Sequence, residues 1–343
     1  MTASDNCLLS LVIGEANTRT TALVKPTALV IAKALTKVAG TEASLGPARP
    51  RSVADYVAAS MASSTLRAYQ SDLHAFVAWG GSIPASADAI AAYLAAHGDA
   101  LAPVTLSRRL VAIGRAHAAL GHANPCRADV VRATMRGICR VHGRAQRQVR
   151  PVLLADLLAM LPFMSGTRGL RDRALLLIGF AGALRRSELV GLNYEDIALV
   201  KQGLTVMIRR SKTDQVGEGR RVAIPYASSI ACPVQALTCW LDHARIQSGP
   251  MFRIVNKGGG IGDRALTPQS VALVVKEYAA KAGLNPAIFS GHSLRAGLIT
   301  SAAKAGVSNW KIRDQSGHRS DAMLQRYVRD AAIFDGNAAG SLL

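Results

Sequence analysis

The sequence has few acidic residues and no long apolar run, and each shortage excludes a class of protein. Asp and Glu number 22 against 41 Lys and Arg, which gives a net charge of +19 over 343 residues. No stretch reaches the roughly 18 apolar residues that a membrane-spanning helix requires. The short apolar run at residues 7–13 follows Asp5 rather than a basic residue, which is atypical of a signal peptide. We therefore expect neither a membrane span nor a secretory leader.

Cysteine is also scarce, and its five positions are scattered: Cys7, Cys126, Cys139, Cys232 and Cys239. An odd number without regular spacing fits neither a disulfide framework nor a zinc site. We interpret these cysteines as reduced packing residues of a cytoplasmic protein. The large positive charge instead indicates a polyanionic partner, which is nucleic acid or an anionic membrane surface.

The chain divides into an N-terminal extension, two domains and a short linker. Residues 1–48 are rich in Ala, Thr, Val and Leu, and disorder is the simplest expectation for them. Residues 49–145 carry apolar side chains at helical spacing, which predicts a small helical domain. Residues 146–151 form the linker, and residues 152–343 form the second domain.

The helical domain presents basic residues opposite its apolar positions. Ser63 or Ser64 is the predicted cap of its first helix, and Pro103 is the predicted start of its third. On that third helix, Arg108 and Arg109 lie opposite the apolar edge. We expect both arginines to face DNA.

A basic stripe follows near the end of this domain. Its four arginines recur at intervals of four residues: Arg132, Arg136, Arg140 and Arg144. On a helix they would form one line about 18 Å long. Asp129 is the only acidic residue between positions 126 and 150, so the stripe has few acidic partners. We interpret it as a phosphate-contacting helix, and an ordinary solvated helix face is the alternative.

The second domain contains the clear strand patterns. Residues 204–208 and 221–225 alternate between apolar and polar side chains, and the polar hairpin loop between them carries Lys212. A later helix begins at Thr267 and ends before Gly283. The fold class is therefore mainly α with a small antiparallel β-sheet, as a helical N-terminal domain followed by an α+β domain.

The C-terminal part concentrates groups suited to phosphoryl chemistry. Two imidazoles, one guanidinium and one phenol occur within 36 residues: His292, Arg295, His318 and Tyr327. Arginine binds phosphate oxygens, histidine exchanges a proton near neutrality, and a tyrosine hydroxyl can form a covalent adduct. These groups suit attack by a phenol on a phosphodiester, and ordinary surface or packing roles are the alternative. Upstream, Glu188 lies three residues after Arg185 and can orient it.

The order of these residues resembles that of the tyrosine recombinases, the lambda-integrase and Cre-like family. The resemblance is carried by an ordered set that covers residues 150–330 in detail and residues 50–145 more loosely: Arg185, Lys212, His292-Ser293-Leu294-Arg295, Gly317-His318 and Tyr327. It implies a helical core-binding domain of the SAM-like kind followed by a catalytic domain. It also implies DNA integration or another form of DNA recombination.

The resemblance implies a role for each residue of the set. Tyr327 would attack the scissile phosphate to form a 3′-phosphotyrosine intermediate, while Arg185 and Arg295 hold the non-bridging oxygens. Lys212 would protonate the leaving 5′-oxygen, and Lys257 and Lys276 are its alternatives. His292 would assist proton transfer from the tyrosine, His318 would bind the phosphate, and Glu188 would brace the site. Neither a metal nor another cofactor is expected.

The implied partners are double-stranded DNA with an inverted-repeat core site and three further copies of the chain. A homotetramer on two DNA sites is expected in the cytoplasm, associated with the nucleoid and without membrane contact, and the tail from Ala331 would dock on a neighbour. A type IB topoisomerase and a non-catalytic DNA-binding protein on the same scaffold are the alternatives. Phage integration, movement of a mobile element, and resolution of plasmid or chromosome dimers all stay open.

Overall fold

The protein is described by a computed structural model that covers residue 56 and residues 60–143, 150–209, 214, 218–321, 324 and 327. The chain splits into two compact units between residues 146 and 147, and each unit has its own apolar core. Within the described ranges, no helix combines the length and apolar character needed to cross a bilayer. Four features expected above lie outside these ranges: the 1–48 extension, Arg144, Lys212 and the tail from Ala331.

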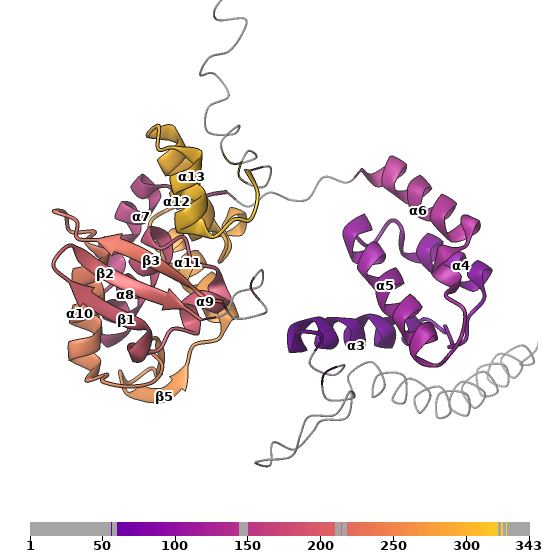
Figure 1. The fold of residues 1–343 in the computed structure, drawn as a ribbon, viewed down its shortest axis with the longest axis horizontal. Helices are drawn as coiled ribbons and strands as arrows, with labels where there is room; N and C mark the ends of the chain where they lie inside the picture. Colours follow the sequence, from indigo (N-terminus) through magenta and orange to yellow (C-terminus); the bar gives the residue numbers. More distant parts are fainter. Residues whose placement is uncertain are drawn as a thin grey trace, which may run out of the picture. The chain divides into compact units, whose positions relative to one another are not determined.

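The N-terminal unit is a helical bundle (Figure 1). Its α-helices within residues 60–143 are α3 (Ser63–Ala78), α4 (Ala87–His97), α5 (Pro103–Ala119) and α6 (Asp129–His142). Ser86 begins α4 because its side chain accepts a hydrogen bond from Ala89 N at 3.1 Å. The predicted cap of α3 is wrong: Ser63 is already helical and Ala62 holds the N-cap position, where no side chain caps the helix.

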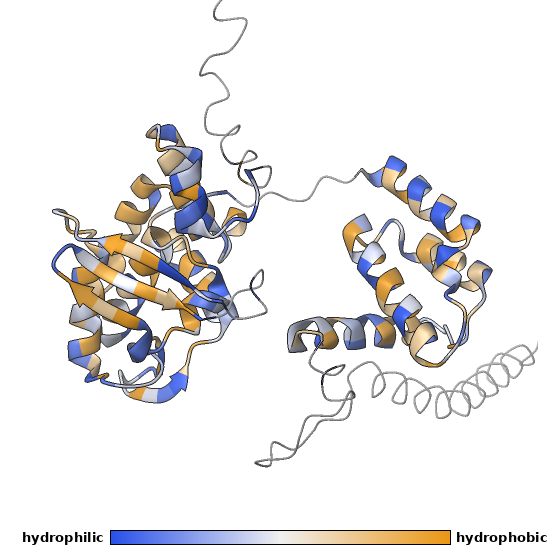
Figure 2. Ribbon diagram, in the orientation of Figure 1, coloured by the Kyte–Doolittle hydropathy of each residue, from blue (hydrophilic) through white to orange (hydrophobic). Residues whose placement is uncertain are grey.

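The core of this unit lies where α3 packs on α5 and α4 packs on α6. Its largest fully buried side chains are Leu73, Phe76, Ile90, Tyr93, Leu94, Leu106 and Ile113. Each such apolar side chain stabilises the fold by about 1.5–3 kcal/mol relative to an exposed one. Figure 2 shows the complementary pattern on α6, where hydrophilic and hydrophobic residues alternate along the helix.

The C-terminal unit combines helices with two small antiparallel sheets. Its helices within the described ranges are α7 (Leu154–Met160), α8 (Gly166–Ala181), α9 (Arg186–Val190), α10 (Pro233–Ala244), α11 (Pro268–Lys281), α12 (Ser293–Lys304) and α13 (Asn309–Ser316). Its strands are β1 (Ile197–Val200), β2 (Gly203–Ile208), β3 (Arg220–Pro225), β4 (Arg253–Val255) and β5 (Ile261–Ala265). The expected fold class, mainly helical with small antiparallel sheets, is confirmed.

The three-stranded sheet has the order β1-β2-β3, and Val206 of its central strand lies opposite Ile197 and Val222. Both strands predicted from alternation are present, as β2 and β3. Strand β1, helix α10 and the β4–β5 hairpin were not predicted. Helix α10 packs on α8 and β3, and its Trp240 indole donates a hydrogen bond to Met251 O at 2.7 Å inside the core.

The helices that lead to the predicted site end where their glycines indicate. Helix α11 begins after Thr267, whose side chain accepts from Ser270 N, and the chain turns at Gly283 with φ +74°. Gly306, with φ +73°, follows the end of α12. Ser308 occupies the N-cap position of α13, although its side chain makes no capping hydrogen bond. Tyr327 is in helical conformation.

Candidate active site

The first part of the site is the turn between α8 and α9. Ala183 adopts φ +48°, a left-handed conformation that is unfavourable for a residue with a Cβ atom. Just beyond it, Arg185 Nη1 donates to Glu188 Oε1 at 2.6 Å, and Arg185 N donates to Glu188 Oε2 at 2.9 Å. The Glu188 side chain is only 1% exposed, so its carboxylate is held by these donors rather than by water. Glu188 therefore orients Arg185, as the spacing of the two residues indicates.

Arg295 forms the centre of the site. It lies on α12, it is buried, and its Nη1 donates to Ala183 O at 2.8 Å and to Ser316 O. These two bonds tie α12 to the α8–α9 turn and to the end of α13. Burial and the nearby Arg185 lower the pKa of Arg295 to about 10, so the guanidinium stays charged at neutral pH.

His318 lies beside Arg295 as a neutral imidazole. Burial, followed by the positive charges of Arg295, Arg185 and Arg220, lowers the pKa of His318 to about 4. Its Nδ1 lies 2.7 Å from Ser316 Oγ, whose single proton is directed to Ile312 O at 2.6 Å. His318 Nδ1–H therefore donates to Ser316. Arg295 Nη2 lies 3.3 Å from Nδ1 and 3.2 Å from Nε2, and Nε2 is the ring nitrogen that can accept from it in this tautomer.

Tyr327 completes this group of side chains. Its ring centroid lies 6.2 Å from that of His318, and the two planes are inclined by 49°. Tyr327 also packs against a small apolar cluster formed by Ile299, Ile312 and Leu324, which supports the ring next to Arg295 and His318. The structure thus brings together Arg185, Glu188, Arg295, His318 and Tyr327 from four separate segments of the chain.

Two further predicted site residues are placed less directly. His292 occupies the N-cap position of α12, and its side chain is exposed at the start of the helix that carries Arg295. The preceding Gly291 lies under Arg186, and a Cβ atom there would come within 1.9 Å of Arg186 Cδ. Lys212 belongs to the β2–β3 connection outside the described residues, so its position relative to the phosphate stays a prediction.

Arg220, the first residue of β3, is a member of the site that sequence reasoning missed. Its Nη1 donates to Gln315 O at 2.9 Å, and its Nη2 lies 3.4 Å from Glu188 Oε2. Burial, the largest cause, lowers the pKa of Arg220 despite the opposing charge of Glu188. Arg220 and Arg221 are adjacent at the start of a strand, where successive side chains alternate between faces, and this signal places one of the two inward.

Two predicted DNA-binding residues of the N-terminal unit, Arg108 and Arg109, have partners within that unit. Arg108 donates through Nε and Nη2 to the buried Asp72, at 2.7 and 2.9 Å. Arg109, with a side chain only 15% exposed, lies 3.8 Å from the same carboxylate and donates to Tyr93 Oη. Both arginines therefore stabilise the packing of α3, α4 and α5, and their contact with DNA stays a prediction.

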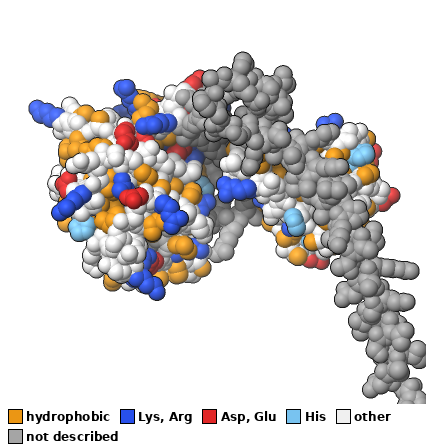
Figure 3. All heavy atoms as spheres, turned by 90° about the horizontal axis from the view of Figure 1, so that it is seen from below, with side chains coloured by type: hydrophobic (Ala, Val, Ile, Leu, Met, Phe, Trp, Pro, Cys, Tyr) orange, Lys and Arg blue, Asp and Glu red, His pale blue; other side chains and the backbone are white. Residues whose placement is uncertain are grey.

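The basic stripe is shorter than the sequence indicated. Helix α6 ends at His142, because Gly143 leaves the helical conformation with φ +70°, and this end precedes Arg144. Arg132 also pairs with Asp129, the one acidic residue of this region, so one member of the stripe has an acidic partner. Arg132, Arg136 and Arg140 are all exposed on α6. Figure 3 shows basic side chains on the surfaces of both units.

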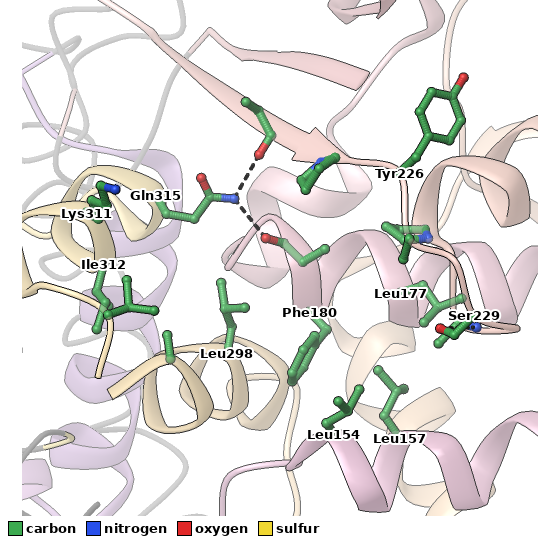
Figure 4. Close-up of a pocket in the computed structure, with 18 residues that line it drawn as sticks. Leu154, Leu157, Leu177, Phe180, Tyr226, Ser229, Leu298, Lys311, Ile312 and Gln315 are labelled. Atoms are coloured by element: carbon green, nitrogen blue, oxygen red, sulfur yellow. Dashed lines mark hydrogen bonds between the residues drawn. The ribbon is translucent and has the colours of Figure 1, made fainter. Parts of the chain in front are cut away.

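An apolar pocket of about 500 Å³ lies beside the site in the C-terminal unit (Figure 4). Residues of α7, α8, β3, α12 and α13 line it, including Leu154, Phe180, Leu298 and Gln315. Gln315 Nε2 donates to Ala181 O at 2.8 Å and to Ala223 O at 3.1 Å, which joins α13 to α8 and β3. The described part of the chain contains no cluster of three or more His, Cys, Asp or Glu side chains that is suited to a metal ion.

This combination of fold and side chains is the one expected of a tyrosine recombinase, and known proteins support the assignment. The Phage integrase family model matches residues 154–332. An integrase/recombinase xerD homolog of Selenomonas ruminantium is 40% identical over 290 residues, which cover 81% of this chain and 85% of that protein. Tyrosine recombinase XerC of Syntrophus aciditrophicus (strain SB) is 28% identical over 205 residues, 56% of this chain and 62% of its own. The chain belongs to the phage integrase family of tyrosine recombinases.

Solved structures agree on the fold. XerH site-specific recombinase, in a post-cleavage complex with palindromic difH substrate, has a TM-score of 0.58 at 18% identity, covering 84% of this chain and 82% of that one. Residues 75–356 of lambda integrase, as a dimer bound to a COC′ core site, give a TM-score of 0.56 at 20% identity, covering 79% and 90%.

Proposed function

We propose that this chain is a site-specific DNA recombinase that cleaves and rejoins strands through a 3′-phosphotyrosine intermediate. The observation that carries the proposal is the contact of Arg295 with His318, next to Tyr327 and to the Arg185–Glu188 pair. These groups supply two fixed positive charges, an imidazole and a phenol at one place. A phosphodiester needs that combination for attack by a tyrosine hydroxyl.

The proposed reaction keeps the phosphodiester bond energy in the enzyme. Tyr327 Oη attacks the scissile phosphorus, the bond to the 5′-oxygen breaks, and a protein–DNA phosphodiester replaces the DNA phosphodiester. Arg185 and Arg295 stabilise the negative charge that builds on the non-bridging oxygens. Lys212 delivers a proton to the leaving oxygen, and His292, exposed at the start of α12, assists removal of the tyrosine proton. Attack by a 5′-hydroxyl of the partner strand reverses these steps, so that neither ATP nor a metal takes part.

His318 acts differently before and after the phosphate enters. In the free protein its Nε2 accepts a hydrogen bond from Arg295, so this nitrogen cannot donate to an oxygen. A phosphate anion offsets the positive charges of Arg295, Arg185 and Arg220, which are among the causes of the low pKa. His318 then takes up a proton and donates to a non-bridging oxygen of the bound phosphate.

The proposed substrate is double-stranded DNA, recognised at an inverted-repeat core site. Exchange of four strands needs four tyrosines, so four copies of the chain assemble on two such sites, in the cytoplasm with the nucleoid. The N-terminal helical unit tracks the phosphate backbone through Arg136 and Arg140 of α6. The tail from Ala331 packs on a neighbouring copy, and the apolar pocket beside α13 is a surface of suitable character for its Ile333 and Phe334 side chains.

The decisive experiment removes only the nucleophile. Tyr327→Phe keeps the aromatic ring that packs on Ile299 and Ile312, so it should bind a half-site duplex with unchanged affinity and form no denaturant-resistant adduct. A covalent adduct formed by this variant would remove Tyr327 from the mechanism. Relaxation of supercoiled DNA that lacks any specific site would instead favour a type IB topoisomerase. Specific binding without any adduct from the wild type would indicate a non-catalytic DNA-binding protein.

A further inference from the structure

Arg220 connects three parts of the site that lie far apart in the sequence. It begins β3, directly after the hairpin loop that carries Lys212. One arm of its guanidinium reaches the Glu188 carboxylate, and the other reaches the carbonyl of Gln315 at the end of α13. The strand, the α9 helix that carries Glu188, and the segment that presents His318 are therefore held together by one side chain.

The space around Arg220 shows that this arrangement is built into the backbone. Gly317, which precedes His318, lies directly under Arg220, and a Cβ atom at this position would come within 2.7 Å of Arg220 Nε. The same nitrogen is buried without a hydrogen-bond partner. Only 20% of the Arg220 side chain is exposed. A long charged side chain is rarely buried to this extent unless it is paired.

The charges of the buried groups indicate what the pairing of Arg220 with Glu188 contributes to the site. Glu188 must lie against Arg185 to orient it, but a lone carboxylate would also cancel the positive charge that Arg185 offers to the phosphate. Arg220 contacts the same carboxylate from the other side, at 3.4 Å against 2.6 Å for Arg185. Together, Arg185, Arg220 and Arg295 carry three positive charges against the single negative charge of Glu188. Two positive charges therefore remain for a phosphate that carries one negative charge and gathers more during attack.

We propose that Arg220 is a positioning residue for strand cleavage, which shares the Glu188 carboxylate with Arg185 so that Arg185 keeps its charge for the scissile phosphate. Through the Gln315 carbonyl, Arg220 also fixes the segment that presents His318. The proposal rests on the phosphotyrosine mechanism above but concerns a residue outside the Arg-Lys-His-Arg-His-Tyr set. It predicts that the loss of Arg220 slows adduct formation because less positive charge acts on the phosphate.

The first test compares two DNA substrates that differ only in charge. Arg220→Gln should bind a half-site with near-normal affinity but form the covalent adduct about 10- to 100-fold more slowly than wild type. This is less than the roughly 10²- to 10³-fold cost of losing a direct electrostatic donor, because Arg220 acts on the phosphate through Arg185. The second substrate is a duplex whose scissile phosphate is replaced by an uncharged methylphosphonate. On this duplex, Arg220→Gln should be less than about threefold slower than wild type. A merely structural role would slow both substrates alike, and that result would overturn the proposal.

The second test restores the charge balance in another way. Glu188→Gln keeps an amide oxygen for Arg185 but removes the negative charge. The double variant that carries both Arg220→Gln and Glu188→Gln should therefore cleave the ordinary phosphodiester faster than Arg220→Gln alone. A double variant as slow as the single one, or slower, would contradict the proposal.

A charge-conserving variant covers the case in which Arg220→Gln fails to fold. Arg220→Lys keeps the positive charge and should stay within about tenfold of the wild-type rate of adduct formation. A rate for Arg220→Lys that falls more than about tenfold below wild type, or a wild-type rate for Arg220→Gln, overturns the assignment. Failure of the wild type itself to form an adduct would instead remove the phosphotyrosine mechanism, so the two failures are distinguishable.

Discussion

The low pKa of His318 makes the free protein sensitive to acid, and the effect can be isolated by one substitution. An imidazole in the unfolded chain titrates near 6.5, whereas burial and three arginines hold the pKa of His318 at about 4 in the folded one. The unfolded chain therefore binds this proton first as the pH falls. The stability that depends on neutral His318 is present above pH 6.5 and is lost as the pH falls from there toward 4.

The size of the loss follows from the two pKa values. When the pH falls from 7 to 5, the unfolded chain takes up a proton at this site and the folded chain largely does not. The free energy of unfolding therefore falls by about 2 kcal/mol for a fully buried ring, and by about 1 kcal/mol once solvent access to His318 is included. His318→Asn lacks the titrating group but keeps an amide that can donate to Ser316 Oγ. The other seven histidines of the chain are present in both proteins, so their effects cancel in the comparison.

The measurement is urea unfolding of wild type and His318→Asn at the two pH values, followed by tryptophan fluorescence, to which the buried Trp240 contributes. Wild type should lose about 1–2 kcal/mol more than the variant on going from pH 7 to pH 5. The difference should shrink when a core-site duplex is bound, because the phosphate offsets the charges that lower the pKa. Equal losses in the two proteins would show that His318 has an ordinary pKa, and the arrangement of arginines around it would then need another explanation.

Three further predictions concern residues outside this cluster or at the edge of the described structure. Lys212→Ala should cleave normal DNA about 10²- to 10⁴-fold more slowly and recover on DNA with a 5′-bridging sulfur, which leaves without a proton. Arg295→Ala should not recover in this way, and equal defects of Lys212→Ala on both substrates would make Lys212 a binding residue. Replacing either Arg136 or Arg140 by Gln should reduce the magnitude of the slope of log K against log salt by roughly 0.9. An unchanged slope in the double variant would identify a solvated helix face. Deleting residues 332–343 should spare half-site binding but weaken synapsis in a two-duplex gel assay, and normal recombination by the truncated protein would exclude a docking role for the tail.

The parts of the fold that sequence predicted best are those with a local cause. Thr267 with Pro268 begins α11, Gly306 follows the end of α12, and strict alternation marks β2 and β3, because caps, turns and pleats depend on neighbouring residues. Strand β1 and the β4–β5 hairpin were missed because their side chains are largely exposed or intermediate and show no clear alternation of burial. Such strands are fixed by pairing with the strand next to them rather than by an alternation of their own.

The site divides in the same manner. The order of Arg185, Arg295, His318 and Tyr327 is visible in sequence, and the structure brings these four together. The partners that tune them are not visible, because Arg220 meets Glu188 across 32 residues and Gln315 across 95. Likewise, Arg108 is 36 residues from Asp72, so its internal pairing could not be read from the helix that carries it.

The two glycines that precede His292 and His318 share one explanation. Gly291 lies under the side chain of Arg186 and Gly317 lies under that of Arg220, so that each Gly-His dipeptide marks a place where an arginine crosses the backbone. A larger residue at either position would displace the arginine, and at Gly317 its backbone would also be strained, because φ there is +65°. A pattern search that looks for histidine alone would accept many unrelated chains, whereas the preceding glycine carries information about a neighbour far away in sequence. The glycine of each Gly-His dipeptide is therefore diagnostic for a steric reason, which is the arginine side chain that lies over it.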